Sequence, residues 1–447
     1  MFKRVLIANR GAVAARILRC LHEMNIEAVA VHSPVDADLP YVAKADAAVA
    51  LAGNRPAESY LDQDAIIAAA LRTGADAIHP GYGFLSENAG FARRVEAEGL
   101  AFIGPSAASI EAMGEKTAAR RRMAEAGLPM VPSSALLGDD AEATLRAADA
   151  IGYPLLVKPA NGGGGIGMMP VRDRSELLEA VQRARTISAR AFADVDIYLE
   201  RLLEQPRHIE FQIAADAHGA VTHLFERDCS LQRRHQKVIE EAGAPGIPRA
   251  ELNAMAERVA AAVGRVGYRT IGTVEMLHHP DTGFSFLEMN TRLQVEHGVT
   301  EEVTGVDLVA TQIRLAAGAP LGETLALAPS MNGHAIEARI YAEDPMRFLP
   351  SPGRLERFRM PADGVRVETG YAEGCTVSPF YDPMVAKVIA HGADRTEAIE
   401  RLLSALRSTE IAGIKTNLPS LISALDSPRF RGGAVHTGVF TEIGKAA

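Results

Sequence analysis

In the first part of the chain, residues 3–104, short apolar runs alternate with stretches of helical periodicity. The runs predict strands, and the stretches between them predict helices. This order is typical of a parallel sheet with helices packed on its faces. The predicted strands span 4–8, 28–32, 75–79 and 101–103, and the predicted helices span 12–24, 62–73 and 87–98.

The rest of the chain has a mixed pattern. Residues 106–126 predict one helix, and 130–203 predict a small module with its own strands, loop and helix. The module's expected elements are a strand at 154–158, a glycine-rich loop at 161–167, a helix at 175–193 and a strand at 197–202. Beyond it we expect two strands within 207–229, helices at 250–266 and 302–318, a strand at 335–341, short strands across 350–392 and a helix at 394–408.

Together these patterns predict a fold that mixes α/β and α+β architecture in three domains. The N-terminal domain, with a doubly wound parallel sheet, is expected to span 1–114. The central domain is expected to span 115–330 and to contain the small module of about 130–203. A mixed C-terminal domain is expected to span 331–447.

A predicted hairpin in the central domain brings two acidic residues together. Strands at 270–278 and 283–289 flank a turn at 279–283, and their pairing places Glu275 close to Glu288. Like charges that face each other across a sheet are destabilising. A divalent cation held by both carboxylates and by Asn290 removes the repulsion, and oxygen atoms are the ligands that Mg²⁺ prefers. A solvated polar face is the alternative.

The stretch from the end of this hairpin to residue 297 alternates between a polar face and a mostly apolar face. If residues 288–297 are extended, side chains alternate between two faces. The apolar face then carries Met289, Leu293 and Val295. The polar face carries Glu288, Asn290, Arg292, Gln294 and Glu296. A half-buried strand with a solvated side has the same pattern, so the alternation alone does not assign a function.

Two loops could bind phosphate groups. The run of four glycines at 162–165 lets backbone N–H groups converge on phosphate oxygens, although a flexible hinge is the alternative. It lacks the G-K-[ST] ending of a Walker loop, so a flap over a nucleotide fits the pattern better. The basic stretch 229–237 is either a solvated loop or a cradle for a polyphosphate.

Composition narrows the function further. The chain has 447 residues and a net charge of −9, which argues against general binding to nucleic acids or anionic membranes. Three widely separated cysteines suggest neither a disulfide framework nor a zinc site. The apolar run at the N-terminus is too short for a signal peptide, and no run reaches transmembrane length. We therefore expect a cytoplasmic protein.

Lysine is rare in this chain. Only eight of the 47 basic residues are lysine, and the others are arginine. Genomic base composition can produce such a bias. Where arginine is the default cation, however, a retained lysine more often serves a role that needs a compact ammonium group. The eight are Lys3, Lys44, Lys116, Lys158, Lys237, Lys387, Lys415 and Lys445.

Short motifs along nearly the whole chain resemble those of biotin carboxylases, a family of ATP-grasp ligases. Each is modest alone, but their order and spacing are highly specific. They are ANRG (8–11), HPGYGFLSENA (79–89), MGEK (113–116), the four-glycine flap, ERDCSLQRRHQKVIEEA (226–242), EMNTRLQVEH (288–297), AEDP (342–345), SPGR (351–354) and GIKTN (413–417). The resemblance implies an ATP-grasp fold in which the small module of about 130–203 is a mobile lid. The nucleotide is then expected to lie between this lid and the central domain.

The resemblance also implies a reaction. ATP phosphorylates bicarbonate to carboxyphosphate, which decomposes to CO₂ and phosphate. The phosphate then removes the N1′ proton of biotin, and the biotin enolate attacks CO₂. Such chemistry depends on positioning and charge neutralisation more than on covalent catalysis. ATP, Mg²⁺ or Mn²⁺, and carrier-bound biotin are therefore the expected cofactors.

Residue roles follow from the matched motifs. The implied metal ligands are Glu275, Glu288 and Asn290, and the implied bicarbonate pocket is formed by Arg292, Gln294 and Val295. Catalytic roles fall on Glu296 as the base, on Arg292, on Arg339 facing the enolate, and on Lys237 near the transferred phosphoryl group. Nucleotide contacts fall on Lys116, Lys158, Gly163, Gly164, Gly165, Glu200, Leu202, Leu203, His208, Gln232 and His235.

Each role has a simpler alternative. Lys116 could be a solvated helix residue, Glu296 could serve only as an ion-pair partner of an arginine, and Arg339 could pair with Asp344. Three positions also depart from the family pattern. Ala12 replaces a usual glutamate, Ile166 replaces a usual cation of the flap, and Gly298 replaces a usual proline.

None of the eight lysines lies between methionines, as the modified lysine of a biotinylated domain does. The chain is therefore expected to act on a separate biotin carboxyl carrier protein and to work with a separate carboxyltransferase. The resemblance also implies a homodimer, because related carboxylases are often dimers. The runner-up function is another ATP-grasp ligase that joins a carboxylate to an amine. A non-catalytic nucleotide-binding subunit is a third possibility, supported by Ile166 and Gly298.

Overall fold

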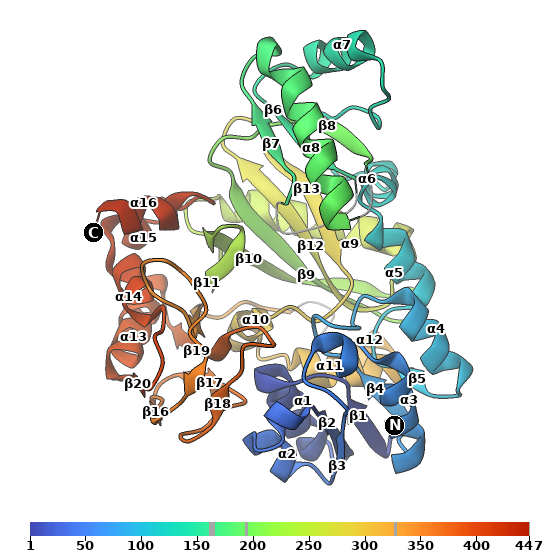
Figure 1. Cartoon of the computed structure of the whole chain (residues 1–447), viewed down its shortest axis with the longest axis vertical. Coiled ribbons are helices and arrows are strands. Elements are labelled where there is room, and N and C mark those ends of the chain that lie inside the picture. The colour runs from blue at the N-terminus through green and yellow to red at the C-terminus, as the bar shows by residue number, and fades with distance from the viewer. Residues whose placement is uncertain (161–165, 193–194, 326–328, 447) are drawn as a thin grey trace.

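The computed structural model describes residues 1–160, 166–192, 195–325 and 329–446. Among these residues, a parallel five-stranded sheet, an antiparallel three-stranded sheet and an antiparallel eight-stranded sheet organise the chain. Figure 1 shows the N-terminal sheet at the bottom, the three-stranded module at the top and the C-terminal helices at the left. The eight-stranded sheet runs between them.

The N-terminal sheet is fully parallel, with strand order β3–β2–β1–β4–β5. Val5 and Ile7 share one core with helix α1, whereas Leu6 packs in another core with helices α3 and α4. Helices therefore cover both faces, which confirms the predicted doubly wound architecture. The elements are β1 (Arg4–Ile7), α1 (Gly11–Glu23), β2 (Glu27–His32), α2 (Pro40–Lys44), β3 (Ala47–Ala50), α3 (Gln63–Thr73), β4 (Ala77–His79), α4 (Ala89–Ala97) and β5 (Ala101–Phe102).

The strand order reverses beside β1, and ligands of such sheets bind where this reversal opens a crevice. Asn9 follows β1, and its amide donates hydrogen bonds to the carbonyls of Pro80 (2.6 Å) and Tyr82 (2.8 Å) after β4. The two loops that carry family motifs are thereby joined at the crevice. The side chain of Asn88 caps the helix that follows.

The three-stranded module has its own hydrophobic core, formed by residues such as Leu155, Val157 and Leu199. Its strands pair in the order β7–β6–β8, with α7 and α8 packed beside them (Figure 1). The sequence pattern missed β7, which has three residues, and α7, which has eleven. The module's elements are α7 (Ala141–Ile151), β6 (Leu155–Pro159), β7 (Met169–Val171), α8 (Leu177–Phe192) and β8 (Ile197–Arg201).

One sheet joins the middle of the chain to its C-terminal part. Its order is β13–β12–β9–β10–β11–β14–β19–β17, so the pairing of β11 with β14 connects segments that lie far apart in the sequence. The strands are β9 (Arg207–Ala215), β10 (Val221–Arg233), β11 (Gln236–Ala242), β12 (Thr270–His279), β13 (Gly283–Asn290), β14 (His334–Tyr341), β17 (Arg366–Glu368) and β19 (Met384–Gly392). The boundaries of the three domains remain a prediction.

Two predicted long helices are each broken into two. The segment 106–126 forms α5 (Ala107–Gly114) and α6 (Lys116–Glu125), because the side chain of Glu115 accepts backbone hydrogen bonds and starts a new helix. The segment 302–318 lies in α10 (His297–Thr304) and α11 (Leu308–Ala316), since Gly305 adopts a left-handed conformation that ends the first helix.

The basic stretch 229–237 is a hairpin rather than a solvated loop. Gln232 pairs with Lys237 across β10 and β11, and the turn residues Arg234 and His235 have φ values of 51° and 67°. A two-residue turn with two positive φ values suits the twist of a hairpin, but it usually contains asparagine or glycine. Neither residue stands here, so residue type alone does not reveal the turn.

The remaining described elements are helices and short strands. No helix among the described residues is long and apolar enough to cross a membrane. The elements are α9 (Arg249–Arg265), α12 (Leu321–Thr324), β15 (Gly353–Arg354), β16 (Arg357–Arg359), β18 (Thr376–Val377), α13 (Arg395–Ser408), β20 (Glu410–Ala412), α14 (Leu418–Asp426), α15 (Pro428–Arg431) and α16 (Val439–Ala446), with short 3₁₀ turns at Pro34–Asp36, Pro56–Glu58 and Arg174–Glu176.

Gly298, which departs from the family pattern, lies in the first turn of α10 against Ile389 of β19. A Cβ atom at position 298 would lie 2.3 Å from Cδ1 of Ile389. Over-packing of a core usually costs about 1–3 kcal/mol. We therefore expect Gly298→Ala to lower the free energy of unfolding by this amount, measured by denaturant unfolding.

The matched control is Gly264→Ala in α9, where the nearest atom lies at an ordinary 3.5 Å. Alanine is favoured over glycine in helices by about 1 kcal/mol, so this variant should be as stable as the parent or more so. Ile389→Val removes the clashing methyl group, and Gly298→Ala should no longer destabilise that background. An unchanged penalty in that background would show that Ile389 is not the cause.

Candidate active site

A cavity of about 910 Å³ lies where the three predicted domains meet. Every predicted site residue that the structure describes lines this cavity, although these residues lie far apart in the sequence. Gly163, Gly164 and Gly165 lie outside the described residues. The predicted residues that line the cavity are Lys116, Lys158, Glu200, Leu202, Leu203, His208, Gln232, His235, Lys237, Glu275, Glu288, Asn290, Arg292, Gln294, Val295, Glu296 and Arg339.

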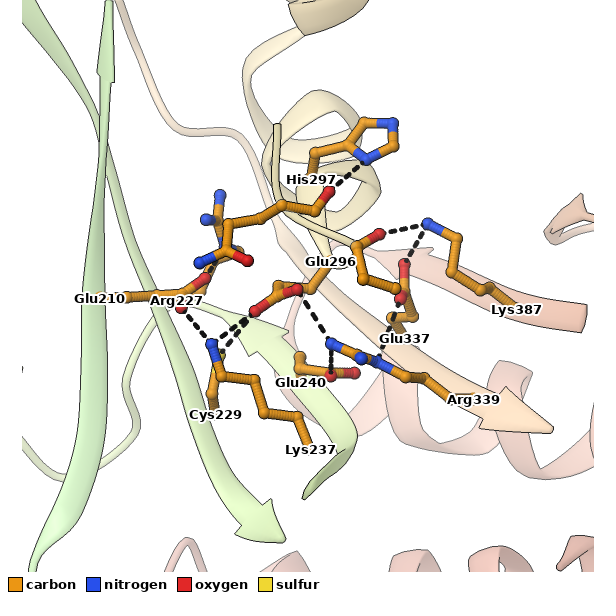
Figure 2. A network of polar contacts seen from close by, with 12 residues as sticks. Glu210, Arg227, Cys229, Lys237, Glu240, Glu296, His297, Glu337, Arg339 and Lys387 are labelled. Atoms are coloured by element: carbon orange, nitrogen blue, oxygen red, sulfur yellow. Dashed lines mark hydrogen bonds and ion pairs between the residues drawn. The ribbon is translucent and has the colours of Figure 1, made fainter. Parts of the chain in front are cut away.

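The ammonium group of Lys237 lies at the centre of the polar part of the cavity. Its Nζ donates to carboxylates of Glu210 (2.6 Å), Glu296 (2.7 Å) and Glu275 (2.8 Å). Figure 2 shows the first two of these contacts. All three carboxylates are buried, and they hold the pKa of Lys237 well above its ordinary value despite the opposing effect of burial. Lys237 therefore keeps its charge at any physiological pH.

The predicted facing of Glu275 and Glu288 is confirmed, because the two residues are direct partners in the register of β12 and β13. Glu275 also accepts from the Asn290 amide (2.8 Å) and contacts His208 Nε2 at 2.9 Å. Burial favours the neutral acid, but Lys237 and His208 outweigh it and hold the pKa of Glu275 well below its ordinary value.

Glu288 has the opposite environment. Burial raises the pKa of its carboxyl group, and the facing charge of Glu275 raises it further, whereas Lys116 Nζ lies 4.0 Å away and only partly compensates. This carboxylate therefore lacks the cationic partners that Glu275 has. Two carboxylates and the amide oxygen of Asn290 form an all-oxygen donor set, which fits a hard divalent cation such as Mg²⁺.

The segment after Asn290 does not continue the strand, although its polar side chains still gather in the cavity. β13 ends at Asn290, and α10 begins at His297. The Arg292 guanidinium reaches back to Asn290 Oδ1 (2.7 Å) and forward to Gln294 Oε1 (2.7 Å). The predicted extended run to residue 297 is therefore too long, because hydrogen bonds between side chains replace the strand ladder here.

Glu296 lies between two cations. Lys237 contacts one carboxylate oxygen, and Arg339 Nη2 donates to the other at 2.9 Å (Figure 2). These cations overcome the effect of burial and hold the pKa of Glu296 well below its ordinary value. Asp344, the alternative partner considered for Arg339, instead contacts Lys415 at 2.8 Å.

Arg339 also contacts a carboxylate that the sequence did not point to. Glu240 Oε1 lies 2.5 Å from Arg339 Nη2, and in the sheet Glu240 directly faces Glu337. Both acids are fully buried. Burial, with the repulsion from neighbouring carboxylates, raises the pKa of Glu240 to about 8 and that of Glu337 to about 7, although Arg339 opposes this for Glu240 and Lys387 for Glu337.

The other end of the cavity is less polar. Leu156 and Met168 of the small module and Leu277 and Leu287 of the hairpin line it. Lys158 lies there, 2.9 Å from Glu200, which also pairs with Arg120 at 2.9 Å. An apolar slot beside buried cations suits a planar base with attached phosphates.

Models of known families match most of the chain. Residues 1–110 match the biotin carboxylase N-terminal domain, 115–324 match the ATP-binding domain of the carbamoyl-phosphate synthase L chain, and 337–442 match the biotin carboxylase C-terminal domain. A biotin carboxylase of Halalkalibacterium halodurans is 49% identical over 442 residues, which cover 99% of this chain and 98% of the relative. This chain belongs to the biotin carboxylase family. It is a ligase that carboxylates biotin with bicarbonate and ATP.

Solved structures of biotin carboxylases share the fold over the whole chain. The biotin carboxylase of Campylobacter jejuni is 41% identical, with a TM-score of 0.94 and 99% coverage of both chains. The biotin carboxylase domain of Hydrogenobacter thermophilus 2-oxoglutarate carboxylase is 42% identical, with a TM-score of 0.93 and coverage of 99% of this chain and 98% of that one. A pyruvate carboxylase subunit of Methanothermobacter thermautotrophicus is 44% identical, over 98% of this chain and 89% of the relative.

Three residues of this biotin carboxylase site were not picked out from the sequence. Glu87 accepts from Arg292 Nε at 2.9 Å. Glu210 contacts Lys237, and the fully buried Arg227 binds Glu210 and donates to Gln212 at 2.8 Å. Glu87 and Arg227 lie inside matched motifs, where a search for charged partners could have found them, and Glu210 could have been found because it shares a strand face with His208.

The buried Glu240 predicts a pH dependence of stability. The unfolded chain releases this proton near pH 4.5, and the folded chain releases it near pH 8. Between these values the folded form binds more protons, so ionisation of Glu240 lowers the free energy of unfolding as pH rises, by up to about 1.4 kcal/mol per pH unit. Glu240→Gln should remove this contribution.

Unfolding of both proteins, measured from pH 6 to pH 8.5, should therefore show that the stability of Glu240→Gln relative to the parent rises with pH. The control is Glu257→Gln, because the Glu257 side chain is 79% exposed and its curve should run parallel to that of the parent. Parallel curves for Glu240→Gln as well would show that Glu240 is already ionised at pH 6.

Proposed function

We propose that this chain carboxylates biotin attached to a separate carrier protein. We also propose that Lys237 links the metal-binding part of the site to the part that holds the base. The supporting observation is that one ammonium group contacts both Glu275, a proposed metal ligand, and Glu296, the proposed base. Bicarbonate attacks the γ-phosphate of ATP, which gives carboxyphosphate and ADP. Carboxyphosphate yields CO₂ and phosphate, the phosphate takes the N1′ proton of biotin, and the enolate attacks CO₂.

The nucleotide is proposed to lie between the small module and the eight-stranded sheet. Lys116 and Lys158 are proposed to neutralise phosphate charge, and they line the same cavity as His208, Gln232 and His235. The adenine is proposed to lie beside Glu200, Leu202 and Leu203, next to the apolar lining described above. Glu275, Glu288 and Asn290 would hold Mg²⁺ or Mn²⁺, which supplies charge neutralisation and orientation of the phosphates when it is bound.

Bicarbonate is proposed to bind beside Arg292, Gln294 and Val295. The Arg292 guanidinium is fixed by contacts with Glu87, Asn290 and Gln294, so its orientation is set before a substrate arrives. Preorganised donors of this kind need no rearrangement at the moment of reaction. Their value lies in holding the bicarbonate oxygen in line with the phosphorus atom.

Glu296 is the proposed base, and its basicity depends on its two cationic neighbours. With Lys237 and Arg339 in contact its pKa is low, which makes it a weak base. Lys237 is proposed to turn toward the transferred phosphoryl group, and Arg339 toward the biotin enolate. Either movement would remove a cation from Glu296 and raise its pKa when bicarbonate must be deprotonated.

The proposed partners are a biotin carboxyl carrier protein and a carboxyltransferase. The similar relatives include proteins named for pyruvate and for 2-oxoglutarate carboxylation, so closely related chains serve different acceptors. We propose that the carboxyltransferase selects the acceptor. A dimer is known for the 2-oxoglutarate carboxylase domain, and a homodimer is proposed here by analogy. A cytoplasmic location stays a prediction.

The runner-up, a ligase that joins a carboxylate to an amine, shares the central ATP-binding domain. It is less well supported, because the regions on both sides of that domain match biotin carboxylase models. The non-catalytic alternative is based on Ile166 and Gly298. Gly298 has a packing reason in the contact with Ile389, so that alternative keeps only the half-exposed Ile166.

The first test is ADP release with ATP, Mg²⁺ and bicarbonate, with and without free biotin. We expect turnover that needs bicarbonate and increases with biotin. Glu296→Ala should lower it by about 100-fold or more, because a general base contributes on this scale. Glu257→Ala, at an exposed glutamate, is the control and should behave like the parent.

Two results would contradict the proposal. ATP binding without turnover, even with a biotinylated carrier protein, would favour the non-catalytic function. Turnover that ignores bicarbonate and needs an amine would favour the runner-up ligase.

A second test concerns the metal. Glu288→Gln removes one of the proposed ligand charges, so the Mg²⁺ concentration needed for half-maximal ADP release should rise by about tenfold or more. Asp281→Asn is the matched control, since Asp281 stands in the turn of the same hairpin and is 86% exposed. Equal Mg²⁺ requirements in the two variants would remove Glu288 from the metal site.

A further inference from the structure

Lys387 is a retained lysine to which neither the family motifs nor the proposed reaction gives a role. It lies in β19 and is fully buried. Its Nζ donates a hydrogen bond to the backbone carbonyl of Val295. Val295 is part of the proposed bicarbonate pocket and directly precedes the proposed base.

Two buried carboxylates fix the position of this ammonium group. Glu368 lies 2.9 Å from Nζ, and Glu337 lies 3.3 Å from it (Figure 2 shows the latter). Glu368 is the direct partner of Lys387 in the register of β17 and β19, and Glu337 comes from β14 on the other side of β19. Nζ is therefore held from both neighbouring strands, and its third contact is the Val295 carbonyl.

No strand ladder supports the segment that receives this contact, although the Thr291 N–H donates to Glu87 (3.0 Å) and the Gln294 carbonyl accepts from the His297 N–H (3.4 Å). Residues 291–296 lie between the end of β13 and the start of α10 and belong to neither element. The Gln294 carbonyl, directly before that of Val295, faces the His297 ring, whose Nδ1 lies 2.8 Å away. Side chains rather than a strand ladder therefore fix two successive carbonyls of the segment that carries Arg292, Gln294 and Glu296.

Charge balance alone would also explain a lysine between Glu337 and Glu368. That role requires a cation near two carboxylates but no contact with the Val295 carbonyl. An ammonium group has three donors, and here each points to a different acceptor on a different part of the chain. The hydrogen bond from Lys387 to the Val295 carbonyl is therefore the contact that charge balance does not explain and a positioning role does.

We propose that Lys387 is a positioning residue that holds the Val295 carbonyl and thereby sets the geometry of the bicarbonate pocket and of Glu296. This inference rests on the proposed function. Lys387 acts through the backbone and touches neither bicarbonate nor biotin. Loss of this contact should impair bicarbonate binding more than nucleotide binding, because the nucleotide contacts lie on other strands and on the small module.

A variant of Lys387 must avoid leaving a buried charge unpaired, since unpaired buried charges are strongly destabilising. Burial already raises the pKa of Glu337 to about 7 against the opposing effect of Lys387. A neutral residue at position 337 is therefore close to a state that the native protein can adopt. The double variant Lys387→Met with Glu337→Gln removes one cation and one anion together.

The experiment measures kcat and the KM values for bicarbonate and ATP in the full chain. It compares the parent, Glu337→Gln, Lys387→Met and the double variant. We expect Glu337→Gln to keep the bicarbonate KM within about twofold of the parent, because Lys387 still reaches Glu368 and Val295. Both variants that lack Lys387 should raise the bicarbonate KM by about tenfold or more, with the ATP KM within about twofold.

Lys415→Met is the control for loss of a lysine, because this side chain is 67% exposed and pairs with Asp344 at the surface. A double variant with the same kcat and the same bicarbonate KM as Glu337→Gln would overturn the proposal, and so would an equal rise in the KM values for bicarbonate and ATP. A double variant that fails to fold beside a folded Glu337→Gln would make Lys387 a structural residue instead. A parent protein without bicarbonate-dependent ADP release would contradict the proposed function itself.

Discussion

The contact of one ammonium group with three buried carboxylates is the constraint on which the rest of the site depends. Each ion taken out of water costs several kcal/mol unless partners replace its solvation. Lys237 satisfies one oxygen each of Glu210, Glu275 and Glu296, which come from two neighbouring strands and from the segment before α10. The pairing register of β9, β12 and β11 must therefore be exact, because a slip of one residue would turn these side chains to the other face of the sheet. The proposed catalytic geometry therefore depends on the correct pairing of these strands.

The same balance of charge extends along the sheet into the C-terminal part. Arg339 and Lys387 are direct partners across β14 and β19, an arrangement of like charges that a sheet tolerates poorly. It persists because Glu240, Glu337 and Glu368 surround the two cations. Burial, together with the neighbouring carboxylates, raises the pKa values of Glu240 and Glu337, so these two groups take up a proton more readily than ordinary glutamates. A cation that leaves this group for a substrate can thus be balanced by a proton, without a change in packing.

Much of the site could be predicted because most of its residues lie in short sequence motifs. The facing of Glu275 and Glu288 followed from a turn and two strands, and the register confirms it. The cavity gathers every predicted site residue that the structure describes, although their catalytic roles remain predictions. What the sequence concealed was set by tertiary contacts. The hairpin at Arg234 and His235 has no favoured turn residues, and Glu240 is recognised as unusual only once Glu337 is placed opposite it.

The departures from the family pattern can be weighed in the same physical terms. At Gly298, Cδ1 of Ile389 occupies the space that a side chain would need. The glycine is therefore explained by packing and is no argument against activity. Ile166 removes one possible cation from the flap, but its side chain is 51% exposed. Lys116, Lys158 and Lys237, the lysines proposed to contact the phosphates, all line the cavity. Because phosphate contacts add as distributed electrostatic terms, the loss of one exposed cation weakens nucleotide binding without removing the chemistry.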